Sequence, residues 1–276
     1  MKKSIKRILT GATILLAGLV IAGCGNKADA SSKTTTVKIG VMSSDEPIWK
    51  PIVKKLKKQD INLKLVEFSD YNTPNKALTD HQIDLNSFQH YNFLDSWNDA
   101  HKTSIVSVGE TYIAPLNLYS SKIKSLKDIK SGDEIAIPND ATNEGRALNV
   151  LEEAGLITLK KGVKLPTVKD ISKNPKKLKI TELEAAQTAR SLTNVTAAVV
   201  TNDIAADADL TVKDAIFRET VNARSKQWIN VIAANKKDKN NKAYKKVVKA
   251  YRTAATAKII AKVYKGTAEP IWTLEK

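Results

Sequence analysis

The chain has 276 residues, of which 42% are hydrophobic and 27% charged, a composition that predicts a globular protein rather than a disordered one. Its formal net charge is +16, but the lysines are scattered and form no basic stripe with interleaved aromatic residues, which argues against nucleic-acid binding. Attraction to anionic lipid or wall polymer is the simpler interpretation of this charge. Three histidines without metal-ligand spacing and the lack of G-x-S-x-G or nucleotide-binding motifs predict no metal site, no cofactor and no enzyme.

The first 24 residues have the layout of a secretory signal. Four basic residues within 2–7 precede an apolar run at 8–21, and Ala22-Gly23-Cys24 follows. Cys24 is the only cysteine, which excludes an internal disulfide, and its setting resembles the lipobox of bacterial lipoproteins. That resemblance implies removal of residues 1–23, and attachment of lipid, palmitate included, to Cys24. A transmembrane helix is the alternative, but about 14 apolar residues are short for a bilayer, which needs roughly 20.

The first half of the remaining chain alternates between strands and helices. Residues 24–36 are small and polar, so we expect a flexible tether there. Hydrophobic periodicity predicts strands at 37–41, 61–68 and 83–88, and helices at 47–58, 75–81 and 91–101. An extended segment follows at 104–120. This alternation predicts a mostly parallel sheet with helices on both faces.

A second alternating unit follows. Strands are predicted at 134–138, 178–182 and 197–201, with helices at 147–154, 185–192 and 203–210. A late strand at 228–235 and one long amphipathic helix at 242–264 end the chain. Two such units predict an α/β fold with two lobes and a cleft between them, lobe 1 being 37–118 plus 226–276 and lobe 2 being 119–225.

Polar residues follow three of the predicted strands, where a cleft would need them. These stretches resemble the NlpA family, the substrate-binding lipoproteins of methionine ABC importers, and the resemblance extends over roughly 37–264. The blocks that carry it are FSDY with PNKAL from residue 68, NSFQH from 86, KIKSL from 122, IPNDATNEGRAL from 137, and NPKKL with ELE from 174. The resemblance implies a type II periplasmic-binding-protein fold that closes around a free amino acid without catalysis. It also implies partnership with an ABC permease and its ATPase, and a position on the extracytoplasmic face of the cell membrane, held by lipid on Cys24.

The resemblance implies four polar ligand-binding residues. Arg146 offers a bidentate fork for the ligand's carboxylate, close to a helix N-terminus that favours anions. Asn143 and Asn202 match asparagines that would contact the backbone of the ligand, and His90 could bond either the ligand or a neighbouring loop. The alternative for each is an ordinary structural role, as a surface arginine or a turn asparagine.

Three aromatic residues, Tyr71, Phe88 and Tyr112, match the family's pocket, where rings would suit a thioether sulfur. Core packing is the alternative role for each. The sequence departs from the family pattern at 91–93, where Tyr-Asn-Phe replaces Lys-Pro-Tyr, and at Ala114, where an aromatic residue is usual. A smaller side chain at Ala114 would reshape the pocket.

We therefore expect a binder of methionine, in its L or D form, or of a close relative. Another small amino acid or a methionine-containing dipeptide remains an alternative within this class. A surface adhesion protein that uses its basic charge, and a tethered hydrolase, are alternatives outside it. Binding to a polymer would weaken steeply with salt, whereas binding in a closed cleft would not.

Overall fold

The computed structural model describes residues 34–274, and within that range the side chains of residues 223 and 224 are not described. The expected signal peptide, Cys24 and most of the expected tether lie outside the described residues. Strand β1 (Thr35–Met42) begins two residues before Val37, so Thr35 and Thr36 belong to a strand and not to the tether. No helix between residues 34 and 274 has the length and apolar character needed to cross a bilayer.

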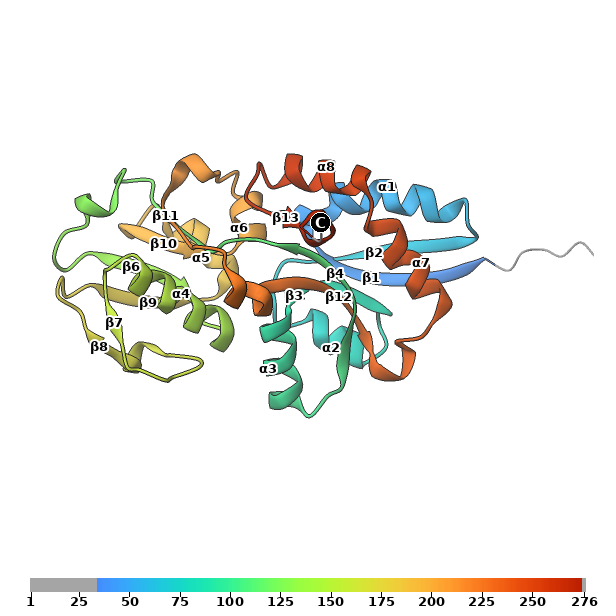
Figure 1. The fold of residues 1–276 in the computed structure, drawn as a ribbon, viewed down its shortest axis with the longest axis horizontal. Helices are drawn as coiled ribbons and strands as arrows, with labels where there is room; N and C mark the ends of the chain where they lie inside the picture. Colours follow the sequence, from blue (N-terminus) through green and yellow to red (C-terminus); the bar gives the residue numbers. More distant parts are fainter. Residues whose placement is uncertain (1–33, 275–276) are drawn as a thin grey trace, which may run out of the picture. The chain divides into compact units, whose positions relative to one another are not determined.

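The first sheet has six strands and carries helices on both faces (Figure 1). Strand β1 pairs in parallel with β2 and β3, whereas β12 runs antiparallel to β3 and β4. Helices α1, α7 and α8 pack on one face, and α2 and α3 pack toward the other. In order across the sheet the strands are β13 (Glu269–Pro270), β4 (Ile105–Ile113), β12 (Ile229–Asn235), β3 (Leu85–His90), β1 and β2 (Ile61–Phe68). The helices are α1 (Glu46–Lys57), α2 (Pro74–Thr79), α3 (Tyr91–His101), α7 (Lys242–Tyr251) and α8 (Ala254–Val263).

The second sheet has five strands and a hydrophobic core of its own. Its strands, in order, are β11 (Ala215–Arg218), β5 (Asn117–Tyr119), β10 (Ala197–Val200), β6 (Glu134–Pro138) and β9 (Lys179–Leu183). Strand β6 is parallel to both β9 and β10. The accompanying helices are α4 (Ala141–Glu153), α5 (Ala185–Ser191) and α6 (Asn202–Asp207), and a small hairpin is formed by β7 (Thr158–Leu159) and β8 (Ile171–Lys173).

Short 3-10 turns connect many of these elements. They are η1 (Ser43–Asp45), η2 (Leu126–Asp128), η3 (Val168–Asp170), η4 (Val212–Asp214), η5 (Ala223–Trp228), η6 (Lys236–Asp238) and η7 (Ile271–Thr273). Three of them, η2, η3 and η4, begin with a capping box, in which a Ser or Thr and an Asp three residues later satisfy each other's backbone N–H groups.

The two sheets confirm the expected two-lobed α/β fold. The chain passes from the first sheet to the second between β4 and β5, and it returns between β11 and β12. The expected boundary between residues 118 and 119 falls inside β5, all of which belongs to the second sheet. The change of sheet therefore precedes Asn117.

Two helix predictions were wrong in their extent. Helix α4 begins at Ala141 and not at residue 147, because the Asp140 side chain caps it by accepting the N–H of Asn143. The expected single helix at 242–264 is two helices, α7 and α8. Thr253 separates them, since its side chain accepts the N–H of Thr256 and starts a new helix.

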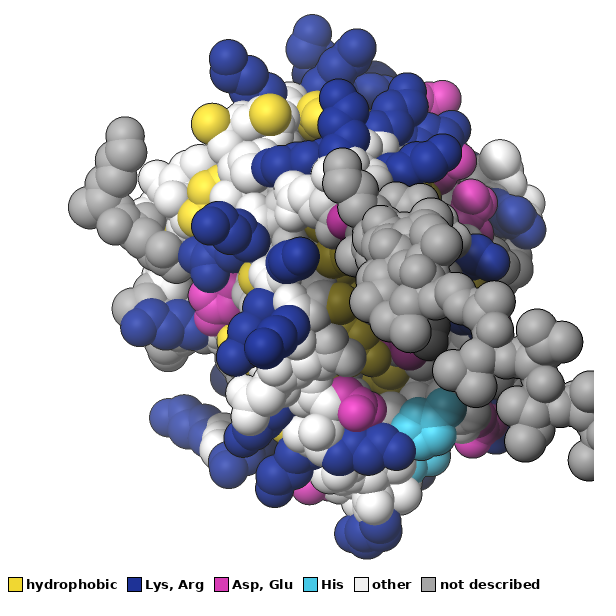
Figure 2. All heavy atoms as spheres, turned by 90° about the vertical axis from the view of Figure 1, so that its right-hand side faces the viewer, with side chains coloured by type: hydrophobic (Ala, Val, Ile, Leu, Met, Phe, Trp, Pro, Cys, Tyr) yellow, Lys and Arg dark blue, Asp and Glu magenta, His cyan; other side chains and the backbone are white. Residues whose placement is uncertain are grey.

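The end of the first lobe that carries α1 and α7 is rich in positive charge. The two helices pack against each other through Trp49 and Tyr251, whose ring centroids lie 4.8 Å apart. Figure 2 looks onto this end of the molecule and shows Lys and Arg side chains gathered over it. The helices thus bury their apolar faces together and present lysines to solvent.

Candidate ligand-binding site

One cavity is formed where the parallel strands β2, β3, β6 and β10 end, the place at which open α/β sheets bind ligands. It contains about 500 Å³ of empty space, its opening to solvent included, which is within the usual range for small-molecule pockets. All seven residues that the sequence predicted as a ligand site line this cavity: Tyr71, Phe88, His90, Tyr112, Asn143, Arg146 and Asn202. The fold therefore brings the seven predicted residues together around one cavity.

Helix α4 positions Asn143 and Arg146. Both residues follow β6, and they are three residues apart, so they project from the same face of the helix. The cap residue Asp140 also accepts hydrogen bonds from Asn143 Nδ2, at 3.0 and 3.1 Å. Because a carboxylate can only accept, the Asn143 amide nitrogen must face Asp140 and its oxygen must point the other way, toward His90.

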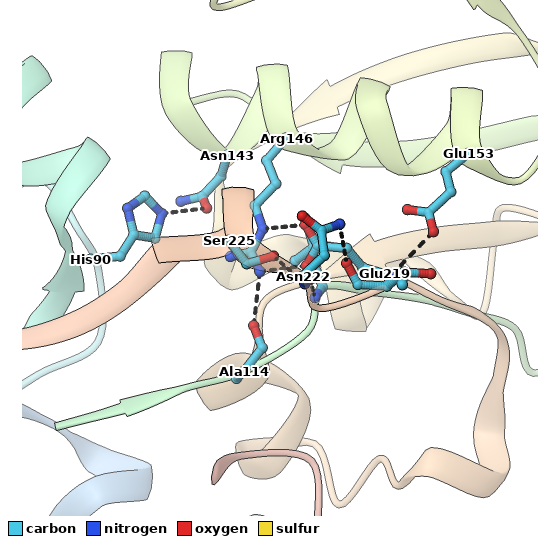
Figure 3. Close-up of polar contacts among 10 residues, drawn as sticks. His90, Ala114, Asn143, Arg146, Glu153, Glu219, Asn222 and Ser225 are labelled. Atoms are coloured by element: carbon cyan, nitrogen blue, oxygen red, sulfur yellow. Dashed lines mark hydrogen bonds and ion pairs between the residues drawn. The ribbon is translucent and has the colours of Figure 1, made fainter. Parts of the chain in front are cut away.

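His90 ends β3 and caps α3. Its Nδ1 accepts the N–H of Phe93 at 3.0 Å, so the neutral ring carries its proton on Nε2, which lies 3.3 Å from Asn143 Oδ1 (Figure 3). Burial, helped by the positive charge of Arg146, lowers the pKa of His90 to about 3. His90 is consequently neutral at physiological pH. It can link the two lobes through Asn143, but it cannot supply a cation for a ligand's carboxylate.

The guanidinium of Arg146 already holds a carboxylate of the protein. Its Nε and Nη2 donate to Glu219 at 3.0 and 2.5 Å, and Nη2 also donates to the Ala114 carbonyl at 2.8 Å (Figure 3). The ring of Trp228 lies 4.6 Å from the guanidinium carbon. No residue whose side chain the structure describes hydrogen-bonds Arg146 Nη1. The expected bidentate fork is therefore occupied on one side by Glu219, and Nη1 is the group left for a ligand.

Aromatic rings form one wall of the cavity. The centroids of Tyr71 and Phe88 lie 6.1 Å apart, and Phe93 packs edge-on against Phe88 at 5.5 Å and against Tyr71 at 6.1 Å. Tyr112 lines the same cavity and is fixed by a hydrogen bond, 3.0 Å long, to the hydroxyl of Tyr264. An apolar or thioether side chain would find contacts of the kind it prefers along this wall.

Helix α6 places unpaired polar atoms in the cavity. Both the amide nitrogen and the amide oxygen of Asn202 are buried and have no hydrogen-bond partner among the described residues. Asp203, the next residue, accepts the Tyr71 hydroxyl on Oδ1 at 2.5 Å, but its Oδ2 is also buried and unpaired. Burial raises the pKa of Asp203, although the bond from Tyr71 opposes this effect. Such groups are costly to leave unsatisfied, and a bound ligand would satisfy them.

Sequence reasoning missed several residues of this site. Asp203, Glu219 and Trp228 were not predicted as site residues, although Asp203 directly follows the predicted Asn202 and Trp228 is the first residue of a predicted strand. Glu219 offered no signal, because it lies 73 residues from Arg146 and only the fold brings the two together. Phe93 was noted as a departure from the family pattern, and it supplies a ring of the aromatic wall.

A second, broader hollow of about 1060 Å³ also touches Arg146. Polar side chains such as Asn149, Glu153 and Gln227 dominate its lining, and it lacks the aromatic wall and the unpaired Asn202 and Asp203. The first cavity is therefore the candidate ligand site. Within residues 34–274 no three His, Cys, Asp or Glu side chains are grouped to hold a metal ion.

Comparison with known proteins places the chain in a family. A model of the NlpA lipoprotein family matches residues 37–272. The probable D-methionine-binding lipoprotein MetQ of Vibrio cholerae serotype O1 is 40% identical over 276 residues, covering 99% of this chain and 100% of that protein. The substrate binding protein of a methionine transporter from Streptococcus pneumoniae has a TM-score of 0.82 and 46% identity, over 86% of this chain and 96% of that one.

A nutrient binding protein from Burkholderia cenocepacia, solved bound to methionine, has a TM-score of 0.81 and 43% identity, over 85% of this chain and 99% of that one. These matches extend over nearly all of the described residues and confirm the resemblance seen in the sequence blocks. The chain belongs to the NlpA lipoprotein family.

Proposed function

We propose that this protein is the lipid-anchored substrate-binding component of an ABC importer, and that it captures methionine between its two lobes. The observation that carries the proposal is the set of unpaired, buried polar atoms of Asn202 and Asp203, in the same cavity as Arg146 and the aromatic wall. The names of the relatives from Vibrio cholerae and Streptococcus pneumoniae support the choice of methionine.

A free amino acid matches the chemistry of the cavity at each end. Its carboxylate would accept from Arg146 Nη1, the guanidinium nitrogen that Glu219 leaves free. Its ammonium would donate to Asp203 Oδ2 and to the amide oxygen of Asn202. Its side chain would lie against the rings of Tyr71, Phe88 and Phe93, where a thioether sulfur makes favourable contacts.

Binding in this cavity would draw the lobes together, because each lobe supplies part of it. His90 and the aromatic wall belong to the first sheet and its connections, whereas Asn143, Arg146 and Asn202 follow strands of the second. The protein would carry out no chemistry itself. It would present the closed complex to a permease, whose ATPase supplies the energy of transport, while lipid on Cys24 keeps the protein at the extracytoplasmic face of the membrane.

Isothermal titration calorimetry on a soluble form that begins at Gly25 tests this function. That form retains every element of the fold between residues 34 and 274. We expect one saturable site for L-methionine or D-methionine. Tighter binding of a methionine-containing dipeptide or of another small amino acid would reassign the ligand, and no saturable binding of any of them below about 1 mM, a free energy near 4 kcal/mol, would refute the proposal.

A further inference from the structure

Seven exposed lysines of helices α1 and α7, together with the C-cap residue of α1, Lys58, lie at one end of the first lobe, and we call these eight residues the lysine face. They are Lys54, Lys55, Lys57, Lys58, Lys242, Lys245, Lys246 and Lys249. Helix α7 contains no acidic residue, and the acidic residue of α1, Glu46, is paired with Lys50 at 2.8 Å. The face therefore has a strongly positive charge that its own helices do not offset.

The two helices hold these lysines close together. Ile52 and Leu56 of α1 share a hydrophobic core with Val247 of α7, so the charged sides of both helices turn outward at the same end of the lobe. Figure 2 shows Lys and Arg side chains gathered over this end. Like charges that lie close together repel, and an external anion bound to them would relieve this repulsion.

The side-chain ammonium groups of the lysine face have no partner in the described fold. None of its eight lysines forms an ion pair or a side-chain hydrogen bond with another residue in the range 34–274. Some lysines elsewhere do have partners: in the second lobe Lys160 pairs with Asp170 at 3.2 Å and Lys179 with Glu134 at 3.1 Å. The lysine face is thus free to meet an external anion.

The first described strand, β1, begins beside this face. The backbone N–H of Thr35 donates to the carbonyl of Asp60 at 2.9 Å, which places the start of β1 at the C-terminal end of α1, next to Lys57 and Lys58. Ten residues lie between Cys24 and Thr35, so eleven Cα-to-Cα steps join them. They reach at most about 40 Å when extended and about 20 Å on average as a flexible coil. Lipid on Cys24 would therefore hold the lysine face near the bilayer.

We propose that the lysine face docks on anionic lipid headgroups, so that this end of the first lobe rests on the membrane. The proposal rests on the lipid anchor proposed above for the choice of partner, because the anchor keeps headgroups within reach of these lysines. Each lysine near an anionic surface strengthens attachment by up to about fivefold, and the attraction fades beyond a Debye length of about 10 Å. Lipid on Cys24 and the lysine face would both attach the protein to the same membrane.

Vesicle co-sedimentation tests the proposal with the unlipidated form that begins at Gly25, so that any binding comes from the folded domain. The vesicles contain phosphatidylcholine with or without 30% phosphatidylglycerol, in 0.1 M salt. One variant replaces the four lysines of α7, Lys242, Lys245, Lys246 and Lys249, with glutamine. A matched variant removes the same charge from the second lobe by replacing Lys127, Lys161, Lys164 and Lys173, all exposed, with glutamine.

We expect the wild type to bind only the anionic vesicles, and to lose that binding in 0.5 M salt. The α7 variant should bind at least tenfold more weakly, and the matched variant less than threefold more weakly. If both variants bound the vesicles equally weakly, net charge alone would explain the binding, and the proposal would be overturned. So would an absence of wild-type binding, or binding to a soluble glycerol-phosphate polymer but not to vesicles. Methionine titration of the same samples separates these outcomes from a failure of the proposed function.

Discussion

Asp203 offers the sharpest test of how the cavity recognises a ligand. Asp203 Oδ1 is held by the Tyr71 hydroxyl at 2.5 Å, whereas Oδ2 is buried and unpaired. Asp203→Asn keeps an acceptor for Tyr71 but replaces the free oxygen with an amide, which removes both the charge and the acceptor for an ammonium. A hydrogen bond to a charged group contributes about 1.5–3 kcal/mol, so methionine should bind about 10- to 150-fold more weakly.

Two analogues assign that loss to the ammonium group. N-acetylmethionine lacks the ammonium, so Asp203→Asn should change its dissociation constant less than about threefold, the effect of a perturbation under 0.7 kcal/mol. Methionine amide keeps the ammonium but lacks the carboxylate, so it should lose as much affinity as methionine does. Calorimetry of both proteins with the three ligands forms a double-mutant cycle. Equal weakening of methionine and N-acetylmethionine would show that Asp203 only shapes the cavity.

The pH dependence of binding gives an independent check on Asp203. Burial raises the pKa of this carboxyl group, so acidification protonates it before it would protonate an exposed aspartate. A protonated Asp203 cannot attract an ammonium, and methionine affinity should fall as the pH is lowered through the raised pKa. Asp203→Asn should flatten this dependence. An unchanged pH profile in the variant would contradict the assignment.

Two further predictions concern buried charges near the site. Glu219→Gln leaves Arg146 buried without a counter-charge, which should lower the free energy of unfolding by about 3 kcal/mol in urea denaturation, and unchanged stability would mean that the pair at 2.5 Å is not structural. Asp45, bonded to Tyr264 at 2.5 Å, has its pKa raised to about 7, by burial first and by the charges of Asp203 and Asp207. Between about pH 4 and 7 the unfolded chain has released a proton that the folded chain still holds, so stability falls across this interval and levels off above it. Asp45→Asn should reduce the fall in melting temperature between pH 5 and pH 8, and an equal fall in both proteins would refute this.

The order of strands and helices could be predicted from the sequence, because it depends on local hydrophobic patterns. Alternating apolar residues marked β2, and apolar spacing marked α1, so the order of strands and helices could be predicted element by element. The predicted ends of helices were wrong where a single capping side chain decides where a helix begins. Asp140 starts α4 six residues earlier than predicted, and Thr253 divides the last predicted helix, although both are ordinary cap residues that periodicity alone does not weigh.

The residues that line the candidate site were predictable as a set, but their contacts with one another were not. Strand-end positions and the family resemblance placed all seven predicted residues in one cavity. The sequence could not predict the partner of Arg146. Glu219 lies next to Arg146 only because β11 pairs with β5 in the second sheet. The unpaired oxygen of Asp203 is likewise a property of packing, since only burial distinguishes it from a solvated carboxylate.

A crystal structure of the unlabelled protein with selenomethionine tests the central claim most directly. The chain contains two methionines, both unlabelled in such a crystal, so anomalous scattering at the selenium edge would come from the ligand alone. We predict one strong selenium peak beside the rings of Tyr71, Phe88 and Phe93, with the ligand's carboxylate at Arg146 and its ammonium at Asp203. A selenium peak outside this cavity, or an empty cavity in crystals grown at a selenomethionine concentration that saturates the protein in solution, would contradict the account.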